Sequence, residues 1–377
     1  MPLPDAIVVG AGIVGAACAE ALARDGLVVD LLDAKPPGGG ATAAGMGHIV
    51  VMDDSEAQFS LTHYSRTLWR SRADEFGDGV EWRETGTIWV ASDEEELVEA
   101  KSKKAYYESR GARATDLDEK ELTDAEPNLR KGLTGGLLVP DDAVLYPPAA
   151  AKWLADLAGA RRGRVLVGNS VRSVGEGFVV LENGERLEAG LVVVAAGVDA
   201  LALLDEPLEG LQIRPRKGHL VITDRYPEFC HHQLVELGYL KSAHGDSASS
   251  VAFNLQPRAT GQLLLGSSRQ FDSETDEVDR DLVTRMIDRA FNYMPSISKL
   301  SVIRIWTGFR AATGDNLPII GRHSTMPNVW LAAGQEGLGI TTSLATGQIV
   351  ADLVAGRQTA IDPSPFSPGR GIGGADA

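Results

Sequence analysis

The sequence is poor in residues that cross-link a chain or bind metals. Cys18 and Cys230 are the only cysteines among 377 residues, and neither belongs to a C-x-x-C pair. We therefore expect no disulfide, no redox dithiol and no cysteine-bound metal. No carboxylate or cysteine motif surrounds the adjacent His231 and His232, so we expect no metal site there either.

Long apolar runs and basic charge are also scarce. No hydrophobic stretch is long enough to span a bilayer, and the first strand begins too early to leave room for a signal peptide. We expect a cytoplasmic protein, with peripheral attachment to the inner membrane left open. The 36 Lys and Arg residues face 52 Asp and Glu residues, for a net charge of −16, which argues against nucleic-acid binding. The negative charge of the protein repels a small anionic substrate, so a local arginine is needed to bind it.

The chain is organised around a glycine-rich turn near its start. An apolar, β-branched run at 6–9 predicts a buried strand, and the small residues after the turn predict a helix packed on it. In the G-x-G-x-x-G pattern, Gly10 allows the tight turn, Gly12 admits a pyrophosphate and Gly15 lets helix and strand pack closely. Asp33 ends a second strand, where a carboxylate can bind a ribose diol. The unit predicts a dinucleotide carrying adenosine, but it does not separate NAD from FAD.

Two further glycine-rich segments bear on that choice. Residues 35–48 are small, nearly uncharged and lead directly into the hydrophobic run 49–52, which indicates close backbone approach to a flat ligand rather than a linker. Far along the chain, a glycine-rich turn at 334–341 opens a helix that extends to Leu353. Such a helix start presents N–H groups and a positive dipole to an electron-rich group. NAD enzymes require no second turn of this kind, so the segment favours FAD.

The order of the predicted elements indicates a chain that passes twice between two domains. Alternating strands and helices are typical of a dinucleotide-binding domain. The remaining strands alternate apolar and polar residues, which is typical of an antiparallel sheet with one solvent-exposed face. We predict an α/β fold with a Rossmann-like domain and a second, mostly antiparallel substrate domain. The former takes residues 1–80, 147–213 and 306–368, the latter residues 81–146 and 214–305, and residues 369–377 form a disordered tail.

The chain resembles the FAD-dependent D-amino-acid oxidase superfamily, which includes glycine oxidase, sarcosine oxidase and D-amino-acid dehydrogenases. The resemblance covers nearly the whole length. It is carried by the N-terminal fingerprint, Ala43–Met46, Ala195–Gly197, Arg214–Gly218, Trp306–Arg310, Asp315–Gly321 and the C-terminal glycine turn. Residues 45–55 and 256–270 are most similar to D-hydroxyproline dehydrogenase flavin subunits.

The resemblance implies a glycine oxidase-like fold and a set of cofactor residues at matching positions. The glycine fingerprint and Asp33 would hold the ADP half of FAD, and the backbone at Val171 would meet the adenine. The whole implied set is Gly10, Gly12, Ile13, Val14, Gly15, Asp33, Ala34, Lys35, Thr42, Ala43, Ala44, Gly45, Met46, Gly47, Val171, Ala196, Gly197, Gly337, Leu338, Gly339, Ile340 and Thr341. The cysteine that carries flavin in monomeric sarcosine oxidase has no counterpart, so noncovalent FAD is implied.

Two residues are implied at the reaction centre. Arg310 occupies the position whose arginine binds the substrate carboxylate in glycine oxidase and D-amino-acid oxidase, and a planar guanidinium suits that role because it donates two parallel hydrogen bonds. A structural ion pair is the alternative. His48 would contact flavin or substrate, or be a hydrogen-bonded structural residue. Arg269, Tyr239 and Lys241 are further candidates for the pocket.

The implied reaction oxidises a small D-amino or cyclic imino acid by hydride transfer from its Cα to flavin N5. D-Hydroxyproline or D-proline is the leading substrate, and a glycine- or sarcosine-type oxidase that uses oxygen is the alternative. From another class, the chain could be a flavin-binding relay subunit of a heteromeric dehydrogenase complex. The sequence leaves the electron acceptor and any partner subunits unknown.

Overall fold

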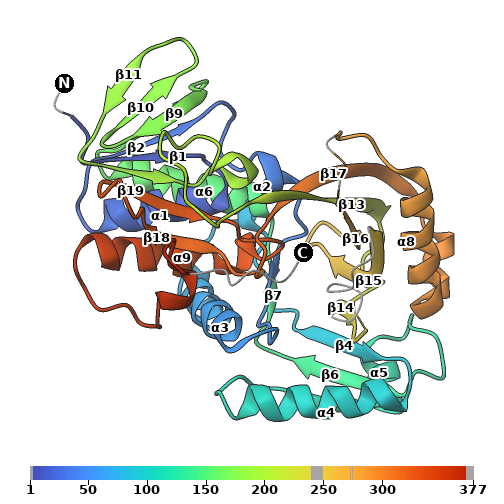
Figure 1. Cartoon of the computed structure of the whole chain (residues 1–377). Coiled ribbons are helices and arrows are strands. Elements are labelled where there is room, and N and C mark those ends of the chain that lie inside the picture. Colours follow the sequence, from blue (N-terminus) through green and yellow to red (C-terminus); the bar gives the residue numbers. More distant parts are fainter. Residues whose placement is uncertain (1–2, 239–248, 272, 274, 371–377) are drawn as a thin grey trace.

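The computed structural model of the protein describes residues 3–238, 249–271, 273 and 275–370. Two large sheets lie side by side and organise these residues (Figure 1). One is mostly parallel and the other mostly antiparallel, and they are called here the parallel sheet and the large sheet.

Six strands form the parallel sheet, in the spatial order β18-β19-β12-β1-β2-β8. They are β1 (Ala6–Val9), β2 (Val29–Asp33), β8 (Arg164–Val167), β12 (Leu191–Val194), β18 (Ile319–Arg322) and β19 (Val329–Ala333). Only β18 runs antiparallel to its neighbour. Val, Ile and Leu dominate the central strands because both faces of the sheet are covered.

Alternate residues of β1 face different layers. One face of the sheet is covered by α1 (Ile13–Arg24), α6 (Pro147–Ala160) and α9 (Gly339–Val354), the other by a small sheet of β9 (Val171–Gly175), β10 (Phe178–Leu181) and β11 (Arg186–Glu188). Ala6 and Val8 pack with the helices, whereas Ile7 and Val9 pack toward the small sheet. Helix α9 packs closely on α1 at Gly347, where an added Cβ would lie 2.5 Å from the α1 backbone. A residue with a side chain at this position would push the two helices apart.

Eight strands form the large sheet, in the order β17-β13-β16-β15-β14-β4-β6-β5. They are β4 (Thr87–Ala91), β5 (Thr115–Asp118), β6 (Gly135–Val139), β13 (Arg214–Arg225), β14 (Gln233–Glu236), β15 (Ser249–Pro257), β16 (Gln262–Gln270) and β17 (Val302–Ala312). All neighbours are antiparallel except β14 and β4. Helix α8 (Arg280–Tyr293) covers the outer face (Figure 1), where Tyr293 stacks on Phe253 with ring centroids 4.8 Å apart. The opposite face remains for the site described below.

The remaining elements lie between or after these strands and helices in the chain. They are α2 (Gly40–Ala44), α3 (Glu56–Ser71), α4 (Glu94–Glu108), α5 (Glu119–Ala125), β3 (His48–Ile49) paired with β7 (Ala143–Val144), and the 3₁₀ turns Ala73–Glu75, Asp78–Val80, Gly197–Asp199, Pro295–Lys299 and Ser364–Phe366. Side-chain caps define several helix starts: Ser55 accepts from Gln58 N, and Asp118 forms a capping box with Glu121.

Two chain segments depart from the expected boundaries. Strand β17 pairs with β13 up to Ala312, so the chain leaves the large sheet six residues beyond the expected position at 306. Arg370, assigned to the disordered tail, instead donates to the Asp315 carboxylate and to the carbonyl oxygens of Leu317 and Pro318. The disordered tail was predicted from the amino-acid composition, and composition does not indicate an ion pair between residues so far apart in sequence. Residues 371–377 lie outside the described part. Within the described part, no helix combines the length and apolar character needed to cross a membrane.

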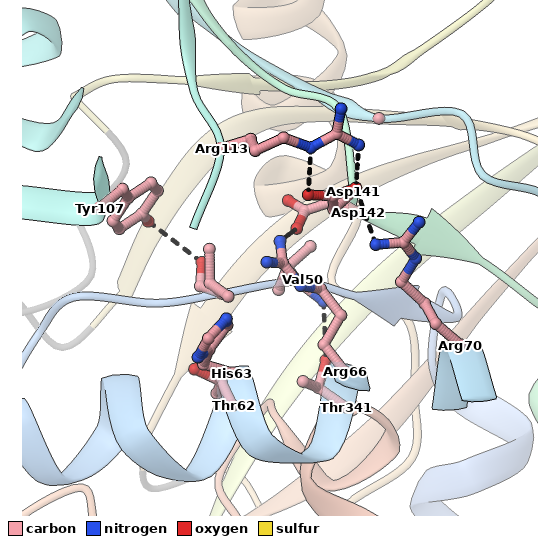
Figure 2. A network of polar contacts seen from close by, with 12 residues as sticks. Val50, Thr62, His63, Arg66, Arg70, Tyr107, Arg113, Asp141, Asp142 and Thr341 are labelled. Atoms are coloured by element: carbon pink, nitrogen blue, oxygen red, sulfur yellow. Dashed lines mark hydrogen bonds and ion pairs between the residues drawn. The ribbon is translucent and has the colours of Figure 1, made fainter. Parts of the chain in front are cut away.

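Ion pairs fix α3 against the loop that precedes β7 (Figure 2). Arg66 on α3 donates to Asp142 at 2.7 Å, and both side chains are almost inaccessible. Next to them, Asp141 accepts from Arg70 at 2.7 Å and from Arg113. Burial raises the pKa of Asp142 to about 6, although Arg66 acts in the opposite direction.

The same region holds the extended segment that follows β3. Tyr107 on α4 donates to Val51 O at 3.1 Å, and Val50 N donates to Thr341 Oγ1 on α9 at 3.4 Å (Figure 2). Because Val50 also lines the cavity described below, this network fixes one wall of the site.

Replacing Arg66 by methionine is expected to lower the free energy of unfolding by about 3 kcal/mol at about pH 7.5, because the Asp142 carboxylate stays buried without its partner. The folded-state pKa of Asp142 lies above its ordinary 3.8, so the stability that this group contributes is present at low pH and is lost as the pH rises through about 6. The cost of the substitution should therefore shrink at about pH 5, where Asp142 takes up a proton. Urea unfolding at both pH values measures this. Lys152→Met, which breaks an exposed pair with Asp156, should cost less than about 1 kcal/mol; an equal cost for both variants would contradict the prediction.

Candidate active site

A cavity of about 740 Å³ opens between the two sheets. On one side it is lined by residues that directly follow strands of the parallel sheet: Gly10 after β1, Ala34 after β2, Ala195 after β12 and Gly334 after β19. Ligands of open α/β sheets bind at this carboxyl edge of the strands. The volume is in the range of a cofactor or small-molecule site.

The glycine turn after β1 is shaped by its neighbours. Gly10 has φ of +101°, and a Cβ there would lie 2.5 Å from Ala195 O, so only glycine fits. A Cβ at Gly15 would lie 1.8 Å from Gly10 O, which explains the close packing of α1 on β1. At Gly12 the nearest atom to such a Cβ would be Thr42 Oγ1 at 3.3 Å, and Gly12 lines the cavity. Of these three positions, Gly12 is the one at which an added Cβ would meet no backbone atom and would instead extend toward the cavity.

Asp33 braces this turn from the end of β2. Its Oδ2 accepts from Ala11 N at 2.7 Å and its Oδ1 accepts from Lys35 N at 2.8 Å. The carboxylate also lines the cavity. Asp33 therefore orders the turn while remaining available to a ribose.

The segments from the two ends of the chain meet at the cavity, as the sequence predicts. A Cβ at Gly45 would lie 2.6 Å from Ile340 Cδ1, and Thr341 Oγ1 donates to His48 O at 2.8 Å. Helices α1 and α9 both begin at the cavity, where the N-cap residues Gly12 and Leu338 provide no side-chain cap, although Ile13 N in α1 donates to Thr42 Oγ1 at 3.0 Å. Their N-terminal N–H groups and positive dipole ends are thus directed to the same space, which suits a phosphate-containing, electron-rich group.

Arg310 projects into the cavity from β17. A Cβ at Gly218 on β13 would lie 2.4 Å from its Nη1, so the guanidinium rests on a strand position that must be glycine. Its Nη1 donates to Ser268 O at 3.0 Å. Burial alone would raise the pKa of Glu336, but Arg216, Arg310 and Arg269 outweigh it and hold that pKa below its usual range. Arg216 forms an ion pair with Glu336, so three arginines and one carboxylate give this end of the cavity a positive field.

His48 lines the cavity at the end of the segment that enters β3. Its Nε2 is buried and has no hydrogen-bond partner among the described residues. Burial lowers the pKa of His48 to about 3. The imidazole is therefore neutral at physiological pH. It can form a hydrogen bond with a ligand through Nε2, but it is a weak base.

The His48→Asn variant is expected to keep the pH dependence of kcat/KM unchanged between about pH 5.5 and 9, because a group whose pKa is lowered to about 3 stays neutral throughout this range. Steady-state rates across that range, with FAD in excess, measure this. Activity should fall less than about tenfold, as for the loss of one neutral hydrogen bond. Loss of an ionisation near pH 6 to 7 from the profile of the variant would show that His48 titrates and would overturn the prediction.

The far wall of the cavity comes from the large sheet. Apolar side chains of Trp89, Leu220 and Val235 line it, and Met52 lines the cavity from the segment that follows β3. Trp89 is held from behind by Lys103, whose Nζ lies 4.6 Å from the ring centroid. None of these residues was predicted as part of the site, because their approach depends on how strands distant in sequence pair.

Most of the predicted site residues do line this cavity. They are Gly10, Gly12, Ile13, Val14, Asp33, Ala34, Lys35, Thr42, Ala44, Gly45, Met46, Gly47, His48, Val171, Ala196, Gly197, Arg310, Gly337, Leu338, Gly339, Ile340 and Thr341. Gly15 and Ala43 lie outside the lining, since Gly15 faces β1 and Ala43 is on the outer side of α2. Arg269 is not in the lining either, and Tyr239 and Lys241 lie outside the described residues.

The fold and the cavity define a dinucleotide-binding α/β protein with a second sheet over the ligand. Residues 5–353 match the sequence model of the family described as FAD dependent oxidoreductase, DAO, so the chain belongs to this family. The predicted family, its glycine oxidase-like fold and FAD as the cofactor are thereby confirmed. The protein is an FAD-dependent oxidoreductase.

Individual relatives match along almost the whole chain. Glycine oxidase of Geobacillus kaustophilus is 29% identical over 98% of this chain and 97% of the relative. The crystal structure of glycine oxidase from that organism matches with a TM-score of 0.87 and 26% identity, over 99% and 100% of the two chains. L-Proline dehydrogenase from P. horikoshii matches with a TM-score of 0.86 and 22% identity over 98% of each chain. Hydrogen cyanide synthase subunit HcnC of Pseudomonas aeruginosa is 26% identical over 97% of this chain and 96% of the relative.

Proposed function

We propose that the protein oxidises a small amino acid or cyclic imino acid at its Cα, with D-proline or D-hydroxyproline as the leading substrate. The observation that carries this proposal is the Arg310 guanidinium in the cavity above Gly218. A substrate carboxylate bound there would accept the paired, charge-assisted hydrogen bonds that a planar guanidinium donates. The names of two relatives, glycine oxidase and L-proline dehydrogenase, support the same substrate class.

In this proposal the residues of the chain orient the substrate and exclude water. Arg310 holds the carboxylate, which directs Cα toward the cofactor, and the wall formed by Met52, Trp89 and Leu220 covers the reacting atoms. FAD, when bound, supplies the acceptor for the hydride that leaves Cα. The neutral His48 offers a hydrogen bond to substrate or cofactor. Loss of the hydride from the uncharged amino or imino acid leaves an iminium ion, which becomes the imine when its N–H proton passes to water.

We propose that FAD is held without a covalent bond by the predicted cofactor residues that line the cavity. Neither Cys18 nor Cys230 lines it. The two helix starts, at Gly12 and Leu338, fit a diphosphate and an electron-rich ring respectively. The corresponding division of the chain assigns residues 1–80, 147–213 and 306–368 to FAD, and residues 81–146 and 214–305 to the substrate, although residues 306–312 still pair with β13 in the large sheet.

A ring suits the apolar wall better than unsubstituted glycine does, because Trp89, Leu220 and Val235 offer surface that glycine cannot cover. The D configuration rests on the resemblance of residues 45–55 and 256–270 to D-hydroxyproline dehydrogenase flavin subunits. A glycine- or sarcosine-type oxidase is the second candidate, supported by the glycine oxidase relatives. The relay-subunit alternative is supported by two relatives that are named as subunits, of hydrogen cyanide synthase and of opine oxidase.

Anaerobic mixing of the purified holoenzyme with D-proline, 4-hydroxy-D-proline, glycine and sarcosine tests these functions. Rapid bleaching of the visible flavin absorbance by the two prolines is the expected result. Bleaching by glycine or sarcosine alone would favour the second candidate. If none of the four bleaches the flavin, while a chemical reductant does so, the proposed reaction is wrong and a relay role remains. Repeating the reaction in air and with a dye acceptor separates oxidase from dehydrogenase.

A further inference from the structure

Three polar side chains interrupt the apolar wall of the cavity. Gln233 on β14, Asn254 on β15 and Ser267 on β16 all line it, and they are only 1%, 5% and 5% exposed. Gln233 Oε1, Asn254 Oδ1 and Ser267 Oγ are buried and have no hydrogen-bond partner among the described residues. Buried polar groups are normally paired, and an unpaired one destabilises the fold. Three of them facing one ligand cavity indicate that a ligand supplies the partner.

Asn254 and Gln233 lie away from the carboxylate end of the cavity, whereas Ser267 is on β16, next to Ser268, whose carbonyl oxygen accepts from Arg310. Asn254 is directly opposite Val235 on one neighbouring strand and Gly266 on the other. The Arg310 guanidinium packs over Gly218, which is on β13, two strands from β15. Two strand spacings are about 10 Å, and hydrogen bonds of about 2.9 Å at both ends leave about 4 Å between them, the width of a small ring. Asn254 and Gln233 therefore face the end of the substrate that is remote from its carboxylate, and the strand that carries Ser267 lies between them and Gly218.

The unpaired atoms define the chemistry of that end. Two of them are carbonyl oxygens, which only accept, and the third is a hydroxyl, which both donates and accepts. Their complement is a group that donates a hydrogen bond and can also accept one. The substrate amine is a donor, but it is bonded to Cα, beside the carboxylate at Arg310, and cannot reach β15 at the same time. A hydroxyl on the far side of the ring meets both requirements.

We propose that Asn254, Gln233 and Ser267 form a subsite that binds a ring hydroxyl, so that the enzyme selects a hydroxylated cyclic imino acid over its unsubstituted analogue. The proposal rests on the proposed function, since it assumes that the carboxylate binds at Arg310. Selection follows because proline leaves these polar atoms without a partner, whereas a ring hydroxyl can donate to one of the two amide oxygens and accept from Ser267 Oγ.

The Asn254→Leu variant tests this, because leucine has a similar shape and lacks the acceptor. In the parent enzyme, kcat/KM for the preferred 4-hydroxy-D-proline isomer should exceed that for D-proline by about tenfold to a hundredfold. The variant should lose most of that ratio through slower oxidation of the hydroxylated substrate, with D-proline little affected. Gln256→Met is the matched control: Gln256 is on the same strand, buried and with an unpaired Oε1, but it does not line the cavity. It should leave the ratio unchanged. A ratio that is unaltered in Asn254→Leu, or equally altered in Gln256→Met, overturns the proposal.

A binding measurement separates failure of the subsite from failure of the proposed reaction. Cyclopentanecarboxylate and its 3-hydroxy derivative carry the ring and the carboxylate but no amine, so they cannot be oxidised. Titration of the bound flavin absorbance should give about tenfold tighter binding of the hydroxy acid to the parent enzyme and equal binding of both acids to Asn254→Leu. If no proline is oxidised yet this difference is found, the proposed reaction fails and the subsite stands. Equal binding of both acids to the parent enzyme overturns the subsite.

Discussion

Replacing Arg310 by alanine is expected to lower kcat/KM for the amino- or imino-acid substrate by about a hundredfold to a thousandfold, with FAD still bound. The guanidinium lies in the cavity above Gly218 and is the group proposed to bind the substrate carboxylate. Its loss removes two charge-assisted hydrogen bonds and also the constraint that directs Cα toward the cofactor. Both kcat and KM should therefore change. Steady-state kinetics, together with the flavin content of the purified variant, measure the effect.

Arg304→Gln is the matched control. Arg304 is on the same strand, but it is exposed, and its guanidinium lies over the Trp306 ring with a separation of 5.4 Å. It does not line the cavity, so its replacement should leave kcat/KM within about twofold. Full activity of Arg310→Ala with FAD retained would contradict the carboxylate role.

Replacing Gly12 by valine is expected to abolish stable FAD binding, reducing the flavin content of the purified protein to less than about a tenth of the parent value. Gly12 lines the cavity where α1 begins, and a branched side chain there would occupy the space in which the backbone approaches the diphosphate. The protein itself should fold, because a Cβ at Gly12 would approach only Thr42 Oγ1, at 3.3 Å. Gly10 and Gly15 are less suitable for this test, since a Cβ at either would collide with the backbone at 2.5 Å or 1.8 Å.

Gly77→Val provides the comparison for the Gly12 variant. Gly77 has φ of −77°, nothing lies within 4 Å of the position of its Cβ, and it is not in the cavity lining. It should retain the parent flavin content. The ratio of flavin to protein absorbance and the far-ultraviolet circular dichroism distinguish loss of cofactor from loss of fold. A Gly12→Val protein that is purified with a full complement of FAD would show that the diphosphate lies elsewhere.

Much of the cofactor side of the site was predictable, because its determinants are local. The φ of +101° at Gly10 and the close contact of Gly15 with the preceding strand follow from a turn only a few residues long. The start of α9 at Gly339 was predictable for the same reason, since a glycine turn before an apolar periodic segment marks a helix N-terminus. The resemblance implied Arg310 as a site residue, and Arg310 does line the cavity, although the extent of β17 around it was underestimated.

The substrate side was not predictable in the same way. Trp89, Val235 and Asn254 come from three strands, and they line one cavity only because β4, β14 and β15 pair in one register. Alternation along each strand shows that successive residues face opposite sides, but not which side faces a ligand. Asn254 could have been singled out as a polar residue in an otherwise apolar stretch, yet its unpaired Oδ1 is apparent only in the assembled structure.

The sequence by itself determined the dinucleotide-binding unit, the second glycine turn and the α/β class, because turn geometry and side-chain periodicity depend on neighbours within a few residues. The tertiary structure alone decided that Gly45 meets Ile340, that Arg310 lies on Gly218, and that polar atoms of Gln233, Asn254 and Ser267 are left unpaired in the cavity. Those contacts join residues far apart in the chain, and long-range strand pairing and packing fix them rather than any local preference.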